Sequence, residues 1–248
     1  MRLFTGLLAA VGICLLVAHP AHAECDRERF VLAIDIGHDV NKWGATSARG
    51  EGEYWFNKRF AQRLFWAAQK TGFIRSFIIN DADAIISLTQ RARIAAQARA
   101  DLLLSIHHDS MREHLLSEWQ YAGMALRYGD QYSGHSLFYS RRNPQADRSR
   151  RFATLLGESL NRSGYQPALH HHGVGQRRLE NRQLGIYHYD PLILLYNAQQ
   201  AAVLFEVGVI LNRDEEIRLS QDAHQDQFIQ HILNAVDRYC AEQQPDRP

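Results

Sequence analysis

Ionisable side chains follow three apolar runs of the sequence, where burial is costly unless such groups are paired or bind a metal. The three stretches are Asp35-Ile-Gly-His38, Ser105-Ile-His-His-Asp109 and Phe205-Glu206-Val-Gly208. In open α/β sheets, ligands bind beyond the carboxyl ends of the strands. If the apolar runs are strands of one sheet, the polar residues that follow them are the first candidates for a site.

Two of these stretches supply a histidine, and a nearby carboxylate would complete a set of three zinc ligands. Catalytic zinc sites use three protein ligands and keep the fourth position for water or substrate. His38 and His107 are the candidate histidines, and either Glu51 or Glu53 can supply the carboxylate, because both precede the first predicted helix. A lone histidine at a strand end is more often a hydrogen-bonded structural residue. The joint occurrence of the three groups predicts a site for one Zn²⁺.

Glu206 lies inside the apolar run Val-Leu-Phe-Glu-Val, so its side chain either pairs with an arginine or acts as a proton acceptor. Zinc lowers the pKa of a bound water from ~15.7 toward ~7 and can polarise a carbonyl group. A glutamate within hydrogen-bond reach could take the proton of that water and deliver it to a leaving amine. The set predicts zinc-dependent hydrolysis of an amide bond, with Glu206 as the catalytic residue.

His108 and three consecutive histidines, His170 to His172, are not assigned to the metal site. Three neighbouring side chains in an exposed loop cannot all face one ion, and such a loop binds metal only adventitiously. Alternatively, these side chains line a substrate groove, in which cationic and hydrogen-bonding groups suit a peptide with carboxylates. The residues predicted to contact substrate are His170, Arg177 and His188.

The elements that must position these residues alternate between strands and helices along the chain. Apolar runs rich in branched residues predict strands over residues 29–36, 73–79, 101–107, 136–139 and 201–207. Apolar residues at helical spacing predict helices over residues 54–71, 88–100, 150–162 and 222–239. This alternation predicts an α/β fold, a mostly parallel or mixed twisted sheet with helices on both faces. Residues 166–190 have no period and are predicted to form a surface or site-lining loop.

The N-terminus has the features of a secretory signal peptide. Arg2 gives a positive start, residues 3–18 are almost wholly apolar, and Ala21-His-Ala23 places small residues at the cleavage site. The apolar run is shorter than the ~20 residues of a membrane span, and no later segment is apolar enough to cross a bilayer. We therefore predict a signal peptide over residues 1–23 and a single catalytic domain over residues 24–248, secreted across the inner membrane to the periplasm or the exterior.

Charge and cysteine content restrict the partners and the compartment. The 28 Lys and Arg residues, of which Arg2 lies in the leader, face 27 Asp and Glu residues. The mature chain therefore has no positive field to attract nucleic acid or an anionic membrane. Cys25 and Cys240 remain after cleavage, and an oxidising compartment permits a disulfide between them. Two unpaired buried thiols are equally compatible with the sequence, because it does not give the Cα separation.

The motifs occur in an order that resembles one known family. They are Ile34-Asp-Ile-Gly-His38, Gly52-Glu53 with Asn57, Ser105-Ile-His107, and Val203-Leu-Phe-Glu-Val-Gly208 with Asn212. This order is similar to that of the zinc-dependent N-acetylmuramoyl-L-alanine amidases of type 3, which have a phosphorylase/hydrolase-like fold. The resemblance implies that His38, Glu53 and His107 bind zinc and that Glu206 is catalytic. It also implies hydrolysis of the bond between the lactyl group of N-acetylmuramic acid and L-alanine in the stem peptides of peptidoglycan.

Some positions depart from the family pattern, and two other functions remain open. Tyr54 stands where a lysine is common, and Asn80 where an arginine is common. One alternative is a catalytically inactive peptidoglycan-binding or regulatory protein, and the other is a zinc carboxypeptidase that acts on stem peptides. Between Tyr139 and Ala201 we expect no inserted helix of the kind that blocks the site in autoinhibited relatives. The sequence indicates neither the preferred stem peptide nor a need for a protein activator.

Overall fold

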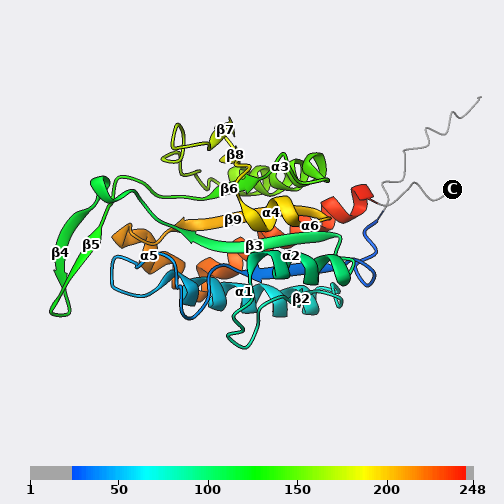
Figure 1. The fold of residues 1–248 in the computed structure, drawn as a ribbon, viewed down its shortest axis with the longest axis horizontal. Helices are drawn as coiled ribbons and strands as arrows, with labels where there is room; N and C mark the ends of the chain where they lie inside the picture. Colours follow the sequence, from blue (N-terminus) through cyan, green and yellow to red (C-terminus); the bar gives the residue numbers. More distant parts are fainter. Residues whose placement is uncertain (1–23, 244–248) are drawn as a thin grey trace, which may run out of the picture.

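Residues 24–243, which the computed structural model describes, form a mixed seven-stranded sheet covered by helices on both faces (Figure 1). The strands lie in the order β2-β1-β3-β9-β6-β8-β7. Their bounds are Leu32–Ile36 (β1), Phe77–Ile78 (β2), Leu102–Asp109 (β3), Ser136–Tyr139 (β6), Arg178–Asn181 (β7), Ile186–His188 (β8) and Ala201–Val209 (β9). The neighbours β2, β1, β3 and β9 are parallel, whereas β6 runs antiparallel to β9 and β7 antiparallel to β8. The predicted α/β fold, with a mixed sheet between helices, is confirmed.

Helices cover the two faces of the sheet unequally. Their bounds are Glu53–Lys70 (α1), Leu88–Gln97 (α2), Ala146–Arg162 (α3), Ile193–Asn197 (α4), Arg213–Leu219 (α5) and Asp222–Gln243 (α6). On one face, Leu32 and Ile34 of β1 pack in a core with α1, α3 and α6, whereas Ala33 packs on the other face with α2 and α4. Successive side chains of a strand point to opposite faces. Because β1 is buried on both, its sequence is a continuous apolar run.

The central strands bring the polar stretches of the sequence to one end of the sheet. β3 pairs with β9 in a register that places His107 opposite Glu206. β1 pairs with β3 on its other side and ends two residues before His38. Ile106 and Phe205 fill the core beneath α1, α3 and α6. The next residue of each strand, His107 or Glu206, therefore faces the side of α2 and α4.

Several elements differ from the sequence-based prediction. The strands β4 (Ser117–Tyr121) and β5 (Met124–Tyr128) form an unpredicted antiparallel hairpin that projects from one end of the molecule (Figure 1). β7 and β8 lie within residues 166–190, so the expectation of a segment without regular structure was wrong there. Only residues 77 and 78 of the strand predicted over residues 73–79 pair as β2. β7 has the polar sequence Arg-Leu-Glu-Asn, so its apolar content does not predict a strand. It forms a strand because it pairs with β8 at the edge of the sheet.

A disulfide joins Cys25 to Cys240, with the two Cα atoms 5.1 Å apart. This bond decides between the two alternatives that the sequence left open for these cysteines. It attaches the start of the described chain to the C-terminal part of α6. That end of α6 lies at the end of the molecule opposite the β4–β5 hairpin (Figure 1).

The predicted signal peptide, residues 1–23, lies outside the described residues. Within residues 24–243, no helix combines the length and the apolar character of a membrane span. α6 has 22 residues, but acidic, basic and amide side chains accompany its apolar face.

Candidate active site

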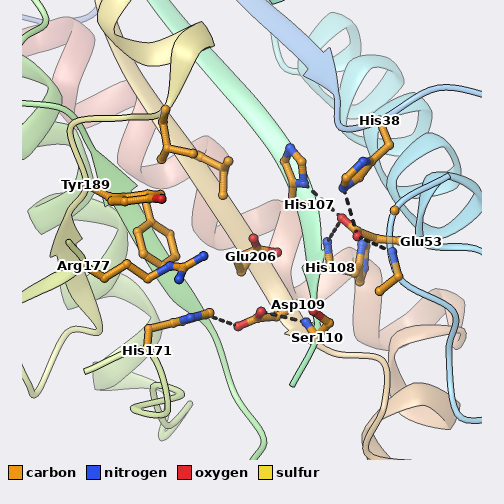
Figure 2. A pocket seen from close by; sticks show the side chains of 15 residues that line it. His38, Glu53, His107, His108, Asp109, Ser110, His171, Arg177, Tyr189 and Glu206 are labelled. Atoms are coloured by element: carbon orange, nitrogen blue, oxygen red, sulfur yellow. Dashed lines mark hydrogen bonds and ion pairs between the residues drawn. The ribbon is translucent and has the colours of Figure 1, made fainter. Parts of the chain in front are cut away.

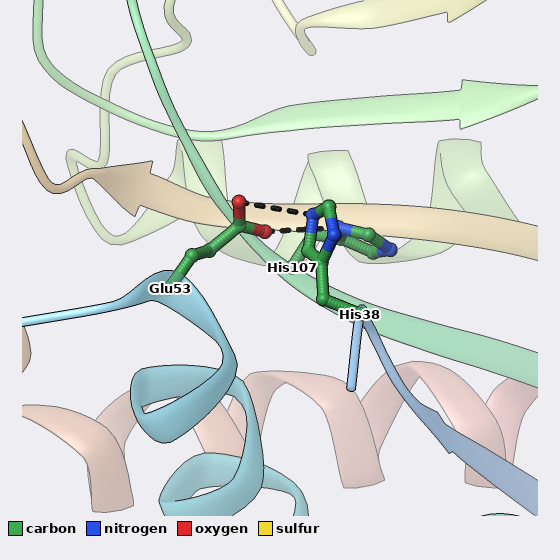
Figure 3. A group of neighbouring side chains, drawn as sticks. All are labelled: His38, Glu53 and His107. Atoms are coloured by element: carbon green, nitrogen blue, oxygen red, sulfur yellow. Dashed lines mark hydrogen bonds and ion pairs between the residues drawn. The ribbon is translucent and has the colours of Figure 1, made fainter. Parts of the chain in front are cut away.

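Three side chains converge at the carboxyl ends of β1 and β3, where they could hold a metal ion (Figure 3). His38 Nε2 lies 3.0 Å from Glu53 Oε2, and His107 Nδ1 lies 3.0 Å from Glu53 Oε1. One ligand atom from each of the three residues lies within 4.8 Å of the other two. Zinc bonds of ~2.0–2.2 Å place tetrahedral ligand atoms roughly 3.3–3.6 Å apart. Small side-chain movements would therefore fit the three predicted ligands around one ion.

The structure separates the two glutamates that the spacing of the sequence left as alternatives. Glu53 is the first residue of α1, and its buried carboxylate faces both histidines. Glu51 instead forms an exposed ion pair with Arg59. The helix dipole also favours a carboxylate at a helix N-terminus. The geometry therefore favours Glu53 as the third ligand.

Hydrogen bonds fix the carboxylate of Glu53 and keep it ionised. Asn57 Nδ2 donates to Glu53 Oε1 (3.2 Å) and to the carbonyl oxygen of Gly37 (3.1 Å). The backbone amide of Ala45 donates to Glu53 Oε2 (3.1 Å). Burial alone would raise the pKa of Glu53, but hydrogen bonds to His107 and His38 lower this pKa below its ordinary range. Metal ligands must be deprotonated, so this environment suits a cation.

Arg91 on α2 holds the turn that carries His38. Its side chain is 2% exposed and donates from Nη2 to the carbonyl oxygen of His38 (2.7 Å). Its Nη1 donates to the carbonyl oxygen of Ile36 (2.7 Å) and to Asp35 Oδ1 (3.1 Å). His38 has φ = +68°, a left-handed conformation that residues other than glycine rarely adopt. Arg91 thus stabilises a strained backbone at a candidate ligand, and Asp35 is its buried partner.

Gly37 and Gly44 have no side chain, and the candidate ligands lie in the space that is therefore open. A Cβ atom on Gly37 would lie 2.5 Å from the ring of His107. A Cβ atom on Gly44, whose φ is +79°, would lie 2.4 Å from Glu53 Oε2 and 2.6 Å from the ring of His38. Atoms do not pack this closely, so a side chain at either position would displace a ligand.

Glu206 lies beside these ligands in the same pocket (Figure 2). Its Oε2 atom is buried and has no hydrogen-bond partner among residues 24–243. Burial, followed by the charges of Asp109 and Glu53, raises the pKa of Glu206 well above its ordinary value. The alternative expected from the sequence, a glutamate paired with an arginine, would have given this oxygen a donor. Its position instead suits a proton acceptor beside the candidate metal site.

The opposite wall of the pocket carries Arg177 and Tyr189 (Figure 2). The guanidinium of Arg177 lies 4.9 Å from the centre of the Tyr189 ring. Of the three residues predicted to contact substrate, Arg177 lines this pocket, whereas His170 and His188 do not. His188 lies 3.9 Å from a carboxylate oxygen of Glu180. Of the three predicted substrate contacts, Arg177 is therefore the one that faces Glu206 across the pocket.

His108 and the three consecutive histidines, His170 to His172, differ in burial. His108 faces α1, where its Nδ1 lies 2.8 Å from Asn57 Oδ1, and burial lowers its pKa to about 3. It is therefore a neutral core residue. His170 and His171 are only 7% and 8% exposed, so the expectation of an exposed loop was wrong for these two. His172 is exposed.

A family model described as N-acetylmuramoyl-L-alanine amidase matches residues 32–238. The chain belongs to this family. It is 25% identical over 239 residues to the uncharacterized protein YqiI of Bacillus subtilis, an alignment that covers 96% of this chain and 98% of that protein. It is 24% identical over 249 residues to the amidase AmiC of Escherichia coli, with 90% of this chain covered but only 56% of AmiC. Among solved structures, the N-acetylmuramoyl-L-alanine amidase of Clostridium difficile 630 has a TM-score of 0.69 at 22% identity, over 88% of this chain and 100% of that one.

Membership of the amidase family makes the protein a hydrolase of amide bonds in peptidoglycan. The family assignment that the order of motifs implied is therefore confirmed. The likeness to the Clostridium difficile structure supports the fold, a mixed sheet between two layers of helices.

Proposed function

We propose that the protein cleaves the amide bond between the lactyl group of N-acetylmuramic acid and L-alanine, with one Zn²⁺ bound by His38, Glu53 and His107. The observation that carries this proposal is the register of β3 and β9, which places Glu206 directly opposite His107. A candidate base thereby lies next to a candidate metal ligand, in one pocket. Sequence order alone could not bring these two residues together.

The residues present fit a zinc ion. Two imidazoles and one carboxylate are a donor set of catalytic zinc sites, and they leave a position for water or substrate. Asn57 and Ala45 orient the carboxylate of Glu53, as the outer partners of metal ligands do. When bound, zinc supplies a Lewis acid and lowers the pKa of a bound water.

Glu206 would transfer the proton in this reaction. Its Oε2, which has no hydrogen-bond partner among residues 24–243, can accept a proton from the attacking water. The same oxygen would then give the proton to the leaving amine nitrogen of L-alanine. A raised pKa suits both steps, since a general acid and base works best when its pKa is close to the operating pH.

Arg177 would bind a carboxylate of the stem peptide from the opposite wall of the pocket. This role predicts that Arg177→Gln raises KM more than it lowers kcat. Arg178→Gln is a matched control, because Arg178 is the exposed next residue and does not line the pocket. Equal kinetics of the two variants on intact sacculi would contradict the assignment.

The proposed substrate lies outside the cytoplasm, and the N-terminal features agree with that location. We propose that residues 1–23 are a cleaved signal peptide and that residues 24–248 are one catalytic domain acting in the periplasm or the exterior. The Cys25–Cys240 disulfide fits an oxidising compartment.

Digestion of purified sacculi tests the proposed reaction, because each possible activity leaves a different product. An amidase releases stem peptides with a free N-terminal L-alanine. A carboxypeptidase would remove C-terminal residues instead, and a binding protein would release nothing. We expect a chelator to abolish release and added zinc to restore it. Activity that persists after verified removal of zinc would exclude the proposed mechanism.

A further inference from the structure

Asp109, His170 and His171 form a second cluster of potential metal ligands, separate from His38, Glu53 and His107. Nε2 of His171 lies 2.6 Å from Asp109 Oδ2, and Nε2 of His170 lies 3.3 Å from the same oxygen. In Figure 2, Asp109 and His171 face each other, and Glu206 lies between this pair and His107. The second cluster is therefore a neighbour of the candidate catalytic site.

The second cluster repeats the donor set of the first. Each offers two imidazole nitrogens and one carboxylate, which zinc and related divalent transition metals bind. The N–O distances are both 3.0 Å in the first cluster, and 2.6 and 3.3 Å in the second. Ligands around one tetrahedral zinc are roughly 3.3–3.6 Å apart. Both clusters could therefore hold an ion after small side-chain shifts.

The three residues of the second cluster are buried. Asp109, His170 and His171 are 5%, 7% and 8% exposed, and a buried carboxylate is costly without compensation. Asp109 Oδ1 accepts a hydrogen bond from the amide of Ser110, and Oδ2 faces the two histidines. Two buried atoms nearby, His170 Nδ1 and Glu206 Oε2, have no partner among residues 24–243. Hydrogen bonds within the described chain thus leave this region incompletely satisfied.

We propose that Asp109, His170 and His171 bind a second divalent cation of the zinc class, in addition to the ion at the first cluster. The carbonyl oxygen of Ser110, 3.0 Å from His170 Nε2, offers a further oxygen ligand. Such an ion would tie the segment that contains His170 and His171 to β3. Arg177 follows in the same segment and lines the pocket, so the ion would fix the wall that carries it.

Arg177 lines the same pocket as Asp109 and His171, and its positive charge opposes such an ion. Its guanidinium contacts the ring of Tyr189, whereas the partners of Asp109 Oδ2 are the two histidines. The carboxylate of Asp109 contacts both histidines and balances the charge of Arg177, so Arg177 does not by itself exclude a cation from the cluster.

The number of zinc ions bound per chain tests this proposal independently of the reaction that the protein catalyses. The mature protein is stripped with a chelator, reloaded with zinc alone, dialysed and measured by elemental mass spectrometry. We expect two zinc ions per chain in the wild type and one in His171→Ala. His172→Ala is the matched control and should keep two, because His172 is the exposed next residue. His107→Ala should lose the other ion and keep one.

One ion in the wild type, with none in His107→Ala, would overturn the second site and leave the amidase proposal intact. An unchanged count in His171→Ala would also overturn it. Circular dichroism checks that each variant is folded, and His170→Gln provides a second variant that should bind one ion. Failure of the sacculus digestion would leave these counts unaffected, so the two proposals fail independently.

Discussion

Replacing Arg91 by methionine tests how the fold holds a candidate metal ligand. Arg91 donates to Asp35 and to the backbone oxygens of Ile86, Ile36 and His38, over distances of 2.7 to 3.1 Å. Methionine fills similar space but donates none of these bonds. The change would leave Asp35, which is 0% exposed, without its positive partner. It would also remove the hydrogen bond that Arg91 donates to the carbonyl oxygen of His38, whose backbone is strained.

The expected loss of stability follows from the burial of the pair. Removing one partner of a buried ion pair costs about 3–5 kcal/mol, because the other charge remains buried. For a chain of this size, the melting temperature should fall by roughly 6–20 °C. Loss of a partner that orients a metal ligand weakens metal binding by about 10- to 100-fold. We expect both effects in Arg91→Met, since Arg91 bonds to the backbone of His38.

Urea unfolding and zinc titration of the purified variant measure these two effects. Arg93→Met is the matched control, because Arg93 lies on the same helix but is exposed. The double variant Asp35→Asn, Arg91→Met should recover part of the lost stability, since it removes the stranded charge. A loss below ~1 kcal/mol in Arg91→Met, equal to that of the control, would refute the reasoning.

Substitutions at the disulfide, at Gly44 and at Glu206 test other parts of the structure, as does the pH dependence of the wild type. Replacing Cys25 and Cys240 by serine opens a loop with a separation of 215 residues, which predicts a loss of about 5 kcal/mol in the free energy of unfolding. An unchanged urea midpoint would contradict this. Gly44→Ala should stay folded but bind less zinc in elemental analysis, because the Cβ of the alanine would lie 2.4 Å from Glu53 Oε2. A variant that binds as much zinc as the wild type would contradict this. Glu206→Gln should keep its zinc and lose about 10²- to 10⁴-fold in kcat, and loss of the metal would instead make Glu206 a ligand. Because burial raises the pKa of Glu206 and a base acts when deprotonated, wild-type kcat/KM should decline as pH falls through that raised pKa. A profile that stays flat down to pH ~4.3 would contradict this.

The strands that build the site could be predicted because their sequences carry the signal of complete burial. β1, β3 and β9 are nearly continuous apolar runs, and each leads into a polar motif. Their parallel order then brings His38, His107 and Glu206 to one end of the sheet. The roles of these residues came from the order of motifs, since spacing alone left Glu51 and Glu53 equivalent.

Other features depend on partners that the sequence does not bring together. β7 becomes a strand only by pairing with β8 at the sheet edge. Arg91 stands among alanines on the buried face of α2, a position that indicates a structural arginine. The sequence could not identify its partner Asp35, which is 56 residues away. The burial of His170 and His171 depends on Asp109, about 60 residues earlier on another element. Such contacts are decided by tertiary packing rather than by local pattern.

The disulfide between Cys25 and Cys240 also changes what a cut in the backbone would do. With this bond, the backbone from Cys25 to Cys240 forms a closed covalent ring. A protease that cleaves the exposed chain near Gly173 would open the ring without releasing a fragment. β3 and β9, which lie on either side of that point in the chain, would remain paired in the centre of the sheet. The two pieces would remain covalently joined until the disulfide is also reduced, and the pairing of β3 with β9 would still hold them together without it.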